Sequence, residues 1–281
     1  MKPLLFIWVL LMSAPVYSKD CVILMHGLAR SSSSLLLMEW KLKREGFQTV
    51  NINYPSTDYT IEELAEATVP TALAKCKDAS VVHFVTHSMG GILLRYWMEQ
   101  AERRPKKLGR SVMLGPPNQG TPLVDQMTVI PGFELWNGPA GMQLGTGDNS
   151  LPLSLGPVDW PLGIVAGSQS VSPFLSAMLD EANDGKVPVS ATTVQGMADH
   201  IILPVTHTFM MNNPKVQDQV FAFLKTGKFV RDDYTERRRG KRIVVGVTVT
   251  SRKVVWLFLE QLRLDFVPAL HRLQGRPAAQ G

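Results

Sequence analysis

Short apolar runs alternate along the chain with longer stretches in which apolar residues recur at helical spacing. The runs rich in β-branched and aliphatic residues predict buried strands at residues 21–25, 48–53, 80–86, 111–114 and 163–166, with a weaker sixth at 192–195. The stretches between them predict helices at residues 33–45, 60–75 and 90–103. This order predicts an α/β protein whose mostly parallel sheet carries helices on both faces.

The beginning of the chain departs from this pattern. Met1 and Lys2 precede an uncharged run over residues 3–18, whose apolar centre is far shorter than the ~20 residues that a membrane-spanning helix needs. The order of basic residue, apolar block and short residues up to Ser18 is typical of a secretory signal peptide. We therefore expect residues 1–18 to be removed and the protein to be secreted or periplasmic; a buried N-terminal strand is the alternative.

Charge sets the other end apart. The sequence holds 29 Lys and Arg against 24 Asp and Glu, a net charge of +5, but residues 231–281 alone hold 11 basic and 5 acidic side chains. The remainder is nearly neutral, so the basic balance does not predict nucleic-acid binding. The apolar part of this extension is interrupted by Arg252 and Lys253, which argues against a transmembrane anchor. An irregular extension is favoured over a tail that binds an anionic surface.

The third predicted strand runs into the string THSMGG at residues 86–91, and a predicted helix follows at once. A serine between a buried strand and a helix start lies on a tight turn with its hydroxyl exposed, and Gly90 leaves room for the neighbouring backbone. The turn also directs the first free helix N–H groups at the atom that the serine attacks. Ser88 is therefore the candidate nucleophile for acyl transfer, with a plain turn serine as the alternative.

This string resembles the GxSxG nucleophile elbow of the α/β-hydrolase superfamily, with Thr86 at the first glycine position as in lipases with an AHSMG form. The HG pair at residues 26–27 is similar to the one that opens the superfamily's oxyanion loop. The resemblance implies that the backbone N–H groups of Leu28 and Met89 are the oxyanion donors. The string GPPNQGT at 115–121 resembles the PNxG segment of extracellular triacylglycerol lipases, and the resemblance extends over about residues 21–229.

The resemblance also implies an arrangement of the strands. If the run at 21–25 is equivalent to the superfamily's third strand, the first two strands are lacking, and this run lies beside the strand that leads to Ser88. Cys21 and Cys76 would then share the end of the sheet remote from Ser88, and a disulfide between them suits an exported protein. We expect a hydrolase domain at 19–230, in which the Gly-, Pro- and Met-rich segment 118–162 forms a lid or acyl pocket.

The order of catalytic residues in this superfamily is serine, then acid, then histidine. Asp184 lies in DGKVPV, which is similar to the DGxVPV string on which these lipases carry their acid, while Asp180 and Asp199 remain alternatives. His207 precedes a stretch of helical spacing, as the catalytic histidine of small secreted lipases does, and His200 is its alternative. His26 is interpreted as a structural residue rather than the base. His83, His87 and His271 are excluded as the base because of their positions in the sequence.

The resemblance implies a serine hydrolase of carboxylic esters, of lipase or esterase type, acting through Ser88, His207 and Asp184. No cofactor or metal is expected, because the sequence has neither a nucleotide-binding glycine pattern nor metal-ligand spacing. The expected partner is a lipid or small ester, and the oligomeric state stays open. An acyltransferase or thioesterase on the same fold, or a non-catalytic protein that binds a lipid or partner, are the alternatives.

Overall fold

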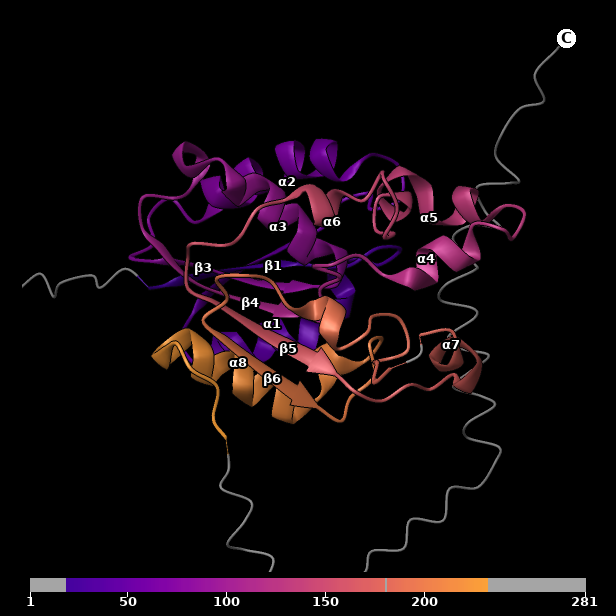
Figure 1. Cartoon of the computed structure of the whole chain (residues 1–281). Coiled ribbons are helices and arrows are strands. Elements are labelled where there is room, and N and C mark those ends of the chain that lie inside the picture. The colour runs from indigo at the N-terminus through magenta and orange to yellow at the C-terminus, as the bar shows by residue number, and fades with distance from the viewer. Residues whose placement is uncertain (1–18, 180, 232–281) are drawn as a thin grey trace, which may run out of the picture.

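The computed structural model describes residues 19–179 and 181–231 (Figure 1). The expected signal peptide at 1–18, the alternative acid Asp180, His271 and nearly all of the basic extension lie outside the described residues. Six parallel strands form one sheet in the order β2-β1-β3-β4-β5-β6. Their bounds are β1 Cys21–Met25, β2 Gln48–Ile52, β3 Val82–His87, β4 Leu108–Leu114, β5 Leu162–Gly167 and β6 Asp199–Leu203.

Helices cover both faces of this sheet, as the alternating pattern predicts. In Figure 1, α2 and α3 lie on one face, and α1 and α8 lie on the other. The helix bounds are α1 Leu36–Arg44, α2 Ile61–Lys75, α3 Met89–Glu99, α4 Pro122–Met127, α5 Phe133–Met142, α6 Leu151–Ser154, α7 Pro173–Ala177 and α8 Pro214–Thr226. Short 3-10 turns add Ser32–Leu35, Ala101–Arg103, Ser190–Thr192 and Met210–Asn212.

Side-chain alternation along the strands builds two apolar layers. In β1 every residue is buried, because successive side chains point to opposite faces of a sheet that is covered on both sides. Ile23 and Met25 join the cluster that packs beneath α2 and α3, whereas Val22 and Leu24 join the cluster beneath α1 and α8. Each fully buried aliphatic side chain stabilises the fold by about 2 kcal/mol.

The pairing of β1 matches the one that the resemblance implies. β1 is the first strand of the described chain, and it pairs with β3, the strand that leads to Ser88, with Met25 opposite Thr86. The carboxyl ends of β1 and β3 therefore meet at one edge of the sheet.

The sixth predicted strand, at 192–195, is wrong. Its amides are used locally, because Thr192 N–H donates to Val189 O and Thr193 N–H donates to Ser190 O around a 3-10 turn. The sixth strand is β6, which pairs with β5 at the edge of the sheet and is only half buried. Three of the four residues at 192–195 are β-branched and favour a strand locally, whereas the observed edge strand is set by its pairing with β5.

The segment expected to cover the site forms short helices rather than one long element. It contains α4, α5 and α6, and α4 and α5 lie beyond the ends of the strand arrows in Figure 1. Gly138 has positive φ and lies so close to Thr57 O that an added Cβ would be 1.7 Å from that atom. The segment therefore packs directly on the loop that follows β2.

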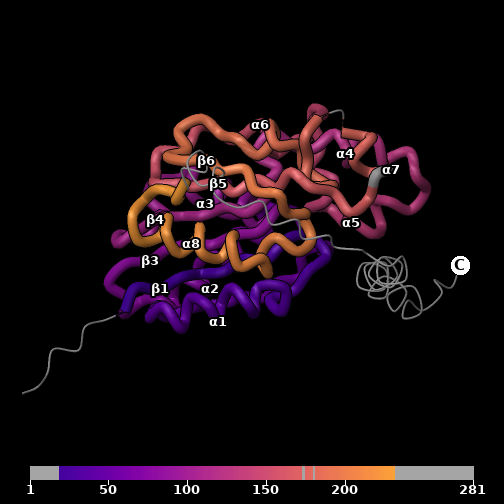
Figure 2. The backbone as a smooth tube through the Cα atoms, turned by 90° about the horizontal axis from the view of Figure 1, so that it is seen from below, coloured from indigo at the N-terminus to yellow at the C-terminus, as the bar shows by residue number. Residues whose placement is uncertain are grey.

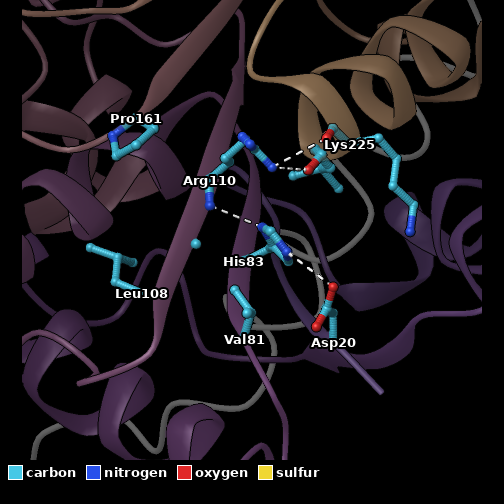
Figure 3. Close-up of a pocket in the computed structure, with 9 residues that line it drawn as sticks. Asp20, Val81, His83, Leu108, Arg110, Pro161 and Lys225 are labelled. Carbon is cyan, nitrogen blue, oxygen red and sulfur yellow. Dashed lines mark hydrogen bonds and ion pairs between the residues drawn. The ribbon is translucent and has the colours of Figure 1, made fainter. Parts of the chain in front are cut away.

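The opposite end of the sheet holds the disulfide and a cavity. Cys21 and Cys76 are bridged, with their Cα atoms 5.8 Å apart. A cavity of about 320 Å³ opens where the strands begin, lined in part by Asp20, His83 and Arg110 (Figure 3). Arg110 Nη1 donates to the carbonyl of Leu224 over 2.8 Å, so its guanidinium stabilises the C-terminal end of α8.

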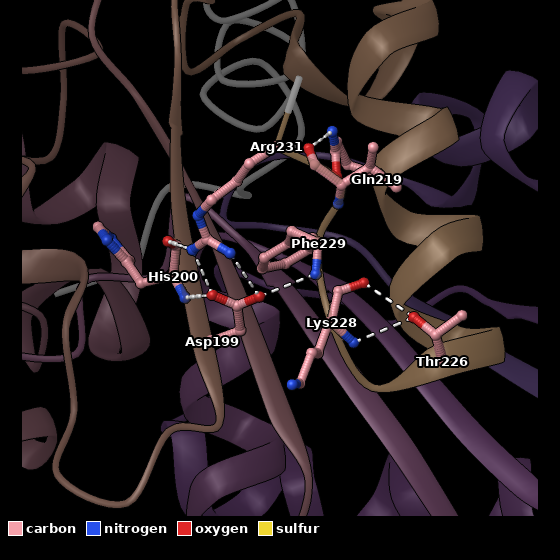
Figure 4. Close-up of polar contacts among 8 residues, drawn as sticks. Asp199, His200, Gln219, Thr226, Lys228, Phe229 and Arg231 are labelled. Carbon is pink, nitrogen blue, oxygen red and sulfur yellow. Dashed lines mark hydrogen bonds and ion pairs between the residues drawn. The ribbon is translucent and has the colours of Figure 1, made fainter. Parts of the chain in front are cut away.

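The last described residues are fastened to the start of β6. The carboxylate of Asp199 accepts the backbone N–H of Phe229 over 2.8 Å and forms an ion pair with Arg231 (Figure 4). Figure 2 shows this chain leaving α8 alongside the sheet. Packed structure therefore extends to Arg231, and the boundaries of the expected domains stay predictions.

We expect the disulfide to contribute strongly to stability, because it closes a loop over a sequence separation of 55 residues. Replacing both Cys21 and Cys76 with Ala should lower the free energy of unfolding by about 3 to 4 kcal/mol, as the loss of a long cross-link does. Urea unfolding of the variant and of the wild type measures this difference. Dithiothreitol should produce the same loss in the wild type and none in the variant, and equal stability of the two proteins would contradict the expectation.

Candidate active site

Ser88 lies at the corner between β3 and α3 in a backbone conformation that L-residues rarely adopt. Its φ is 52° and its ψ is −126°. Its N–H donates to the carbonyl of Leu114 at the end of β4 over 2.8 Å, and its own carbonyl accepts from Gly91 N–H over 2.9 Å. These bonds hold a conformation that costs on the order of 1 to 3 kcal/mol, as found at functional sites.

The corner depends on the glycines around it. A Cβ on Gly90 would lie 2.6 Å from the carbonyl oxygen of His26 and 2.7 Å from that of Met25. A Cβ on Gly27 would lie 3.0 Å from the Cβ of Ser88. The end of β1 and the first turn of α3 are thus in direct backbone contact, and a side chain at either glycine would separate them.

His207 lies within hydrogen-bond distance of both predicted partners. Its Nε2 is 3.0 Å from Ser88 Oγ, and its Nδ1 is 2.7 Å from Asp184 Oδ2. The three residues come from the end of β3, the loop after α7 and the turn before α8. The structure therefore brings together the three side chains that the sequence singled out, over separations of 119 and 23 residues.

The carboxylate of Asp184 is fully buried and is bonded at both oxygens. Oδ1 accepts the backbone N–H groups of Lys186 and Val187 over 3.0 and 2.8 Å, which leaves Oδ2 for His207. Added Cβ atoms on Gly115 and Gly167 would meet Asp184 at 3.0 and 2.7 Å. These two glycines make the room that the buried carboxylate occupies, and the sequence reasoning did not find them.

The two predicted oxyanion donors lie on the two sides of this corner. Met89 is the first residue of α3, so its N–H has no acceptor in the preceding turn of the helix. Leu28 follows Gly27, and the Leu28 side chain reaches α5, where a Cβ on Gly141 would lie 2.9 Å from Leu28 Cδ2. Ala29 next to it has a φ of 52°, a second strained residue at this edge.

No family model and no curated protein matches this sequence. The fold does match solved structures. The mature form of lipase BlEst2 from Bacillus licheniformis superposes with a TM-score of 0.57 and 18% identity, covering 78% of this chain and 95% of that one. The chain has the α/β-hydrolase fold.

Two further structures with this fold are longer. Phospholipase PlaB from Legionella pneumophila gives a TM-score of 0.53 at 18% identity, covering 71% of this chain and 56% of that one. Lipase B from Aspergillus fumigatus gives a TM-score of 0.53 at 16% identity, covering 74% of this chain and 52% of that one. The chain thus spans about half the length of each. At these identities the likeness concerns the fold.

The alternative acid and base do not join the site of this α/β-hydrolase fold. Asp199 is paired with Arg231 at the beginning of β6, and His200 Nε2 lies 2.9 Å from Thr192 Oγ1. His83 accepts the N–H of Arg110 at the far end of the sheet. Each of these side chains is engaged by partners that hold it away from Ser88.

His26 is held as a structural residue by partners that the sequence reasoning did not find. Its Nδ1 lies 2.9 Å from Gly27 O, and its Nε2 accepts the N–H of Tyr54. The Tyr54 ring stacks on it with centroids 4.0 Å apart, and the Tyr54 hydroxyl donates to His26 O. Tyr54 lies two residues after the end of β2, the neighbour of β1. The carboxyl ends of parallel strands meet at a common edge, and this position is the signal that could have identified Tyr54.

Within residues 19–179 and 181–231, no group of three His, Cys, Asp or Glu side chains is arranged to hold a metal ion. In the same residues, no helix is both long and apolar enough to cross a membrane.

Substituting Gly90 with Ala should damage the corner, because the new Cβ would collide with two carbonyl oxygens rather than with a flexible side chain. We expect a loss of about 2 kcal/mol in the free energy of unfolding, typical of overpacking. Gly147→Ala is the matched control, since no atom lies within 4 Å of a Cβ at that position. Chemical unfolding of both variants checks this, and equal stability would show that β1 and α3 separate freely.

Acid should weaken the fold through His26, because burial lowers the pKa of its imidazole to about 4. Between that value and the ordinary value near 6.5 only the unfolded chain binds the proton, so stability falls as the pH falls. The wild type should lose about 3 kcal/mol through this group between about pH 7 and pH 4. Urea unfolding across this range should show that the free energy of unfolding depends less steeply on pH in His26→Gln than in the wild type. Identical slopes would show that His26 does not contribute to the pH dependence.

Proposed function

We propose that this protein is a serine hydrolase of carboxylic esters, of lipase or esterase type. The observation that carries the proposal is the continuous chain of hydrogen-bond distances from Ser88 Oγ through the His207 ring to Asp184 Oδ2, at 3.0 and 2.7 Å. A nucleophile, a base and a group that orients the base in this arrangement suit acyl transfer. The fold shared with BlEst2 supports the same class.

The proposed reaction begins when Ser88 Oγ attacks the acyl carbonyl carbon and its proton passes to Nε2 of His207. Asp184 accepts from Nδ1–H, which keeps Nε2 free to take the proton and stabilises the imidazolium. His207 then gives this proton to the leaving alcohol, and an acyl ester remains on Ser88. Water, deprotonated by the same nitrogen, attacks that ester and releases the carboxylic acid.

The backbone N–H groups of Leu28 and Met89 would stabilise the negative oxygen of the tetrahedral intermediate. This assignment is supported by the contact between Gly27 and Ser88, which brings the loop after β1 to the corner. Donors fixed by the backbone need no rearrangement as the charge develops, and losing one typically costs about 10² to 10³ in rate.

Segment 118–162 would supply the lid or acyl pocket. It contacts the proposed oxyanion loop, because Leu28 lies against α5. It also displays apolar side chains to solvent: Val129 is 82% exposed, Leu135 is 73% exposed and Trp136 is 42% exposed. Exposed apolar surface on the segment that contacts the proposed oxyanion loop suits esters with an apolar acyl chain. The substrate we propose is therefore a lipid or small apolar ester.

Export is part of the proposal, with residues 1–18 as a cleaved signal peptide. The disulfide between Cys21 and Cys76 supports it, since such bridges form and persist mainly in oxidising compartments. The protein would then act in the periplasm or outside the cell.

Labelling with a fluorophosphonate probe, followed by hydrolysis of p-nitrophenyl esters from acetate to palmitate, tests this function. Asp184→Asn should lower kcat by about 10⁴-fold, because the base loses its correct tautomer. His207→Ala should have a comparable effect, and Ser88→Ala should abolish both labelling and turnover. Thermal unfolding establishes that each variant is folded.

Asp199→Asn and His200→Ala are the matched controls, since these are the other acid and base considered for the same roles. Both should keep kcat within a few-fold of the wild type. No labelling of folded wild type would favour a non-catalytic binding protein. Labelling with transfer to added alcohols or cleavage of thioesters, and without ester hydrolysis, would favour the acyltransferase or thioesterase.

A further inference from the structure

His87, the last residue of β3, reaches from the strand of the nucleophile to the turn of the base. Its side chain is buried, and its Nε2 lies 3.0 Å from the carbonyl oxygen of His207. A carbonyl oxygen only accepts hydrogen bonds, so Nε2 of His87 carries the proton. This contact joins residues 120 positions apart in the sequence.

The peptide of His207 is held from two sides. Its N–H donates to the carbonyl of Asp184 over 2.9 Å, and its carbonyl accepts from His87. His207 lies in a turn between β6 and the 3-10 turn Met210–Asn212, so no regular element fixes its backbone. These contacts therefore set the place from which the His207 side chain extends toward Ser88.

The His87 ring is suited to lie beside a base that becomes positively charged. Burial lowers the pKa of His87 well below its ordinary value, and the neighbouring charges of His207, Arg30 and Lys186 act in the same direction. The centroids of the two imidazole rings are 4.9 Å apart. A second positive charge at that distance would oppose proton transfer to His207, so a neutral donor is the form that assists it.

The other ring nitrogen argues against a purely space-filling role. Nδ1 of His87 is buried and has no hydrogen-bond partner among the described residues, and a Cβ on Gly27 would lie 3.0 Å from it. An unpaired buried nitrogen is destabilising, and an apolar side chain of similar size would occupy the space without that cost. The presence of a histidine at position 87 is thus explained by its Nε2–H donor rather than by the volume of its ring.

We propose that His87 is a positioning residue for His207: its neutral Nε2–H donor fixes the carbonyl of His207 and thereby keeps the base within hydrogen-bond distance of Ser88. The proposal rests on the hydrolase function proposed above. A small displacement of a base can lower the rate by about 10²-fold, so a defect confined to kcat is the expected signature.

The test compares His87→Phe, which keeps a ring and removes the donor, with His87→Gln, which restores an N–H donor on a flexible chain. On p-nitrophenyl butyrate, His87→Phe should lower kcat by about 10- to 100-fold at an unchanged KM, and His87→Gln should recover most of that loss. His83→Phe is the matched control: it removes a buried histidine of the same strand whose partner is Arg110. It should lose stability and keep the wild-type kcat.

Proton NMR of the His207 Nδ1–H bonded to Asp184 gives a readout that does not depend on turnover. This resonance should be present in the wild type, His87→Gln and His83→Phe, and lost by solvent exchange in His87→Phe. If His87→Phe does not fold, His87→Leu removes the same donor with a smaller side chain.

An unchanged resonance and kcat in the donor-free variant, a wild type without the resonance, or equal defects in His87→Phe and His87→Gln would overturn the proposal. A wild type that shows the resonance and its dependence on His87, yet neither hydrolyses esters nor reacts with fluorophosphonate, would instead refute the hydrolase function. The two failures are thereby separated.

Discussion

The close backbone contact between the end of β1 and the first turn of α3 is the constraint on which the site depends. A Cβ on Gly90 would collide with two carbonyl oxygens at the end of β1, and Gly27 lies against Ser88. With both side chains absent, the corner after β3 can turn sharply enough to present the hydroxyl of Ser88. The positive φ of Ser88 is tolerated because the sheet and α3 over-determine its position.

Neutral, buried imidazoles on both sides of the corner complement that backbone geometry. Burial lowers the pKa of His26 and of His87, so both rings stay uncharged near neutral pH and act through directed hydrogen bonds. His26 supports the loop after β1, and His87 contacts the turn of the proposed base. Neither ring therefore adds a positive charge beside the proposed base.

Several stabilising contacts lie at the end of the sheet opposite to the proposed chemistry. The disulfide, the cavity lined by His83 and Arg110, and the ion pair between Asp199 and Arg231 all lie where strands begin. Ser88, Asp184 and His207 lie in loops beyond the carboxyl ends. A parallel sheet favours this division, because its rigid strands position loops whose sequence can vary without disturbing the core.

The sequence by itself determined the α/β order, five of the strands and Ser88 as the candidate nucleophile, while the resemblance to α/β-hydrolases favoured Asp184 and His207 among several candidate acids and bases. The spacing of apolar residues and the strand–turn–helix order around Ser88 are local properties, so they can be recognised from the sequence alone. The edge strand β6 was not predicted, because its pairing with β5 is a long-range contact that outweighs the local strand preference of the β-branched residues at 192–195.

Only the tertiary structure decided between His207 and His200 as the neighbour of Ser88, and between Asp184 and Asp199 as the partner of that histidine. It also placed Tyr54, His87 and the glycines at 115 and 167, whose roles are contacts across the sheet edge. Such contacts join residues that lie far apart in the sequence, up to 120 positions for His87 and His207. Their geometry follows from packing the whole sheet, and no local pattern encodes it.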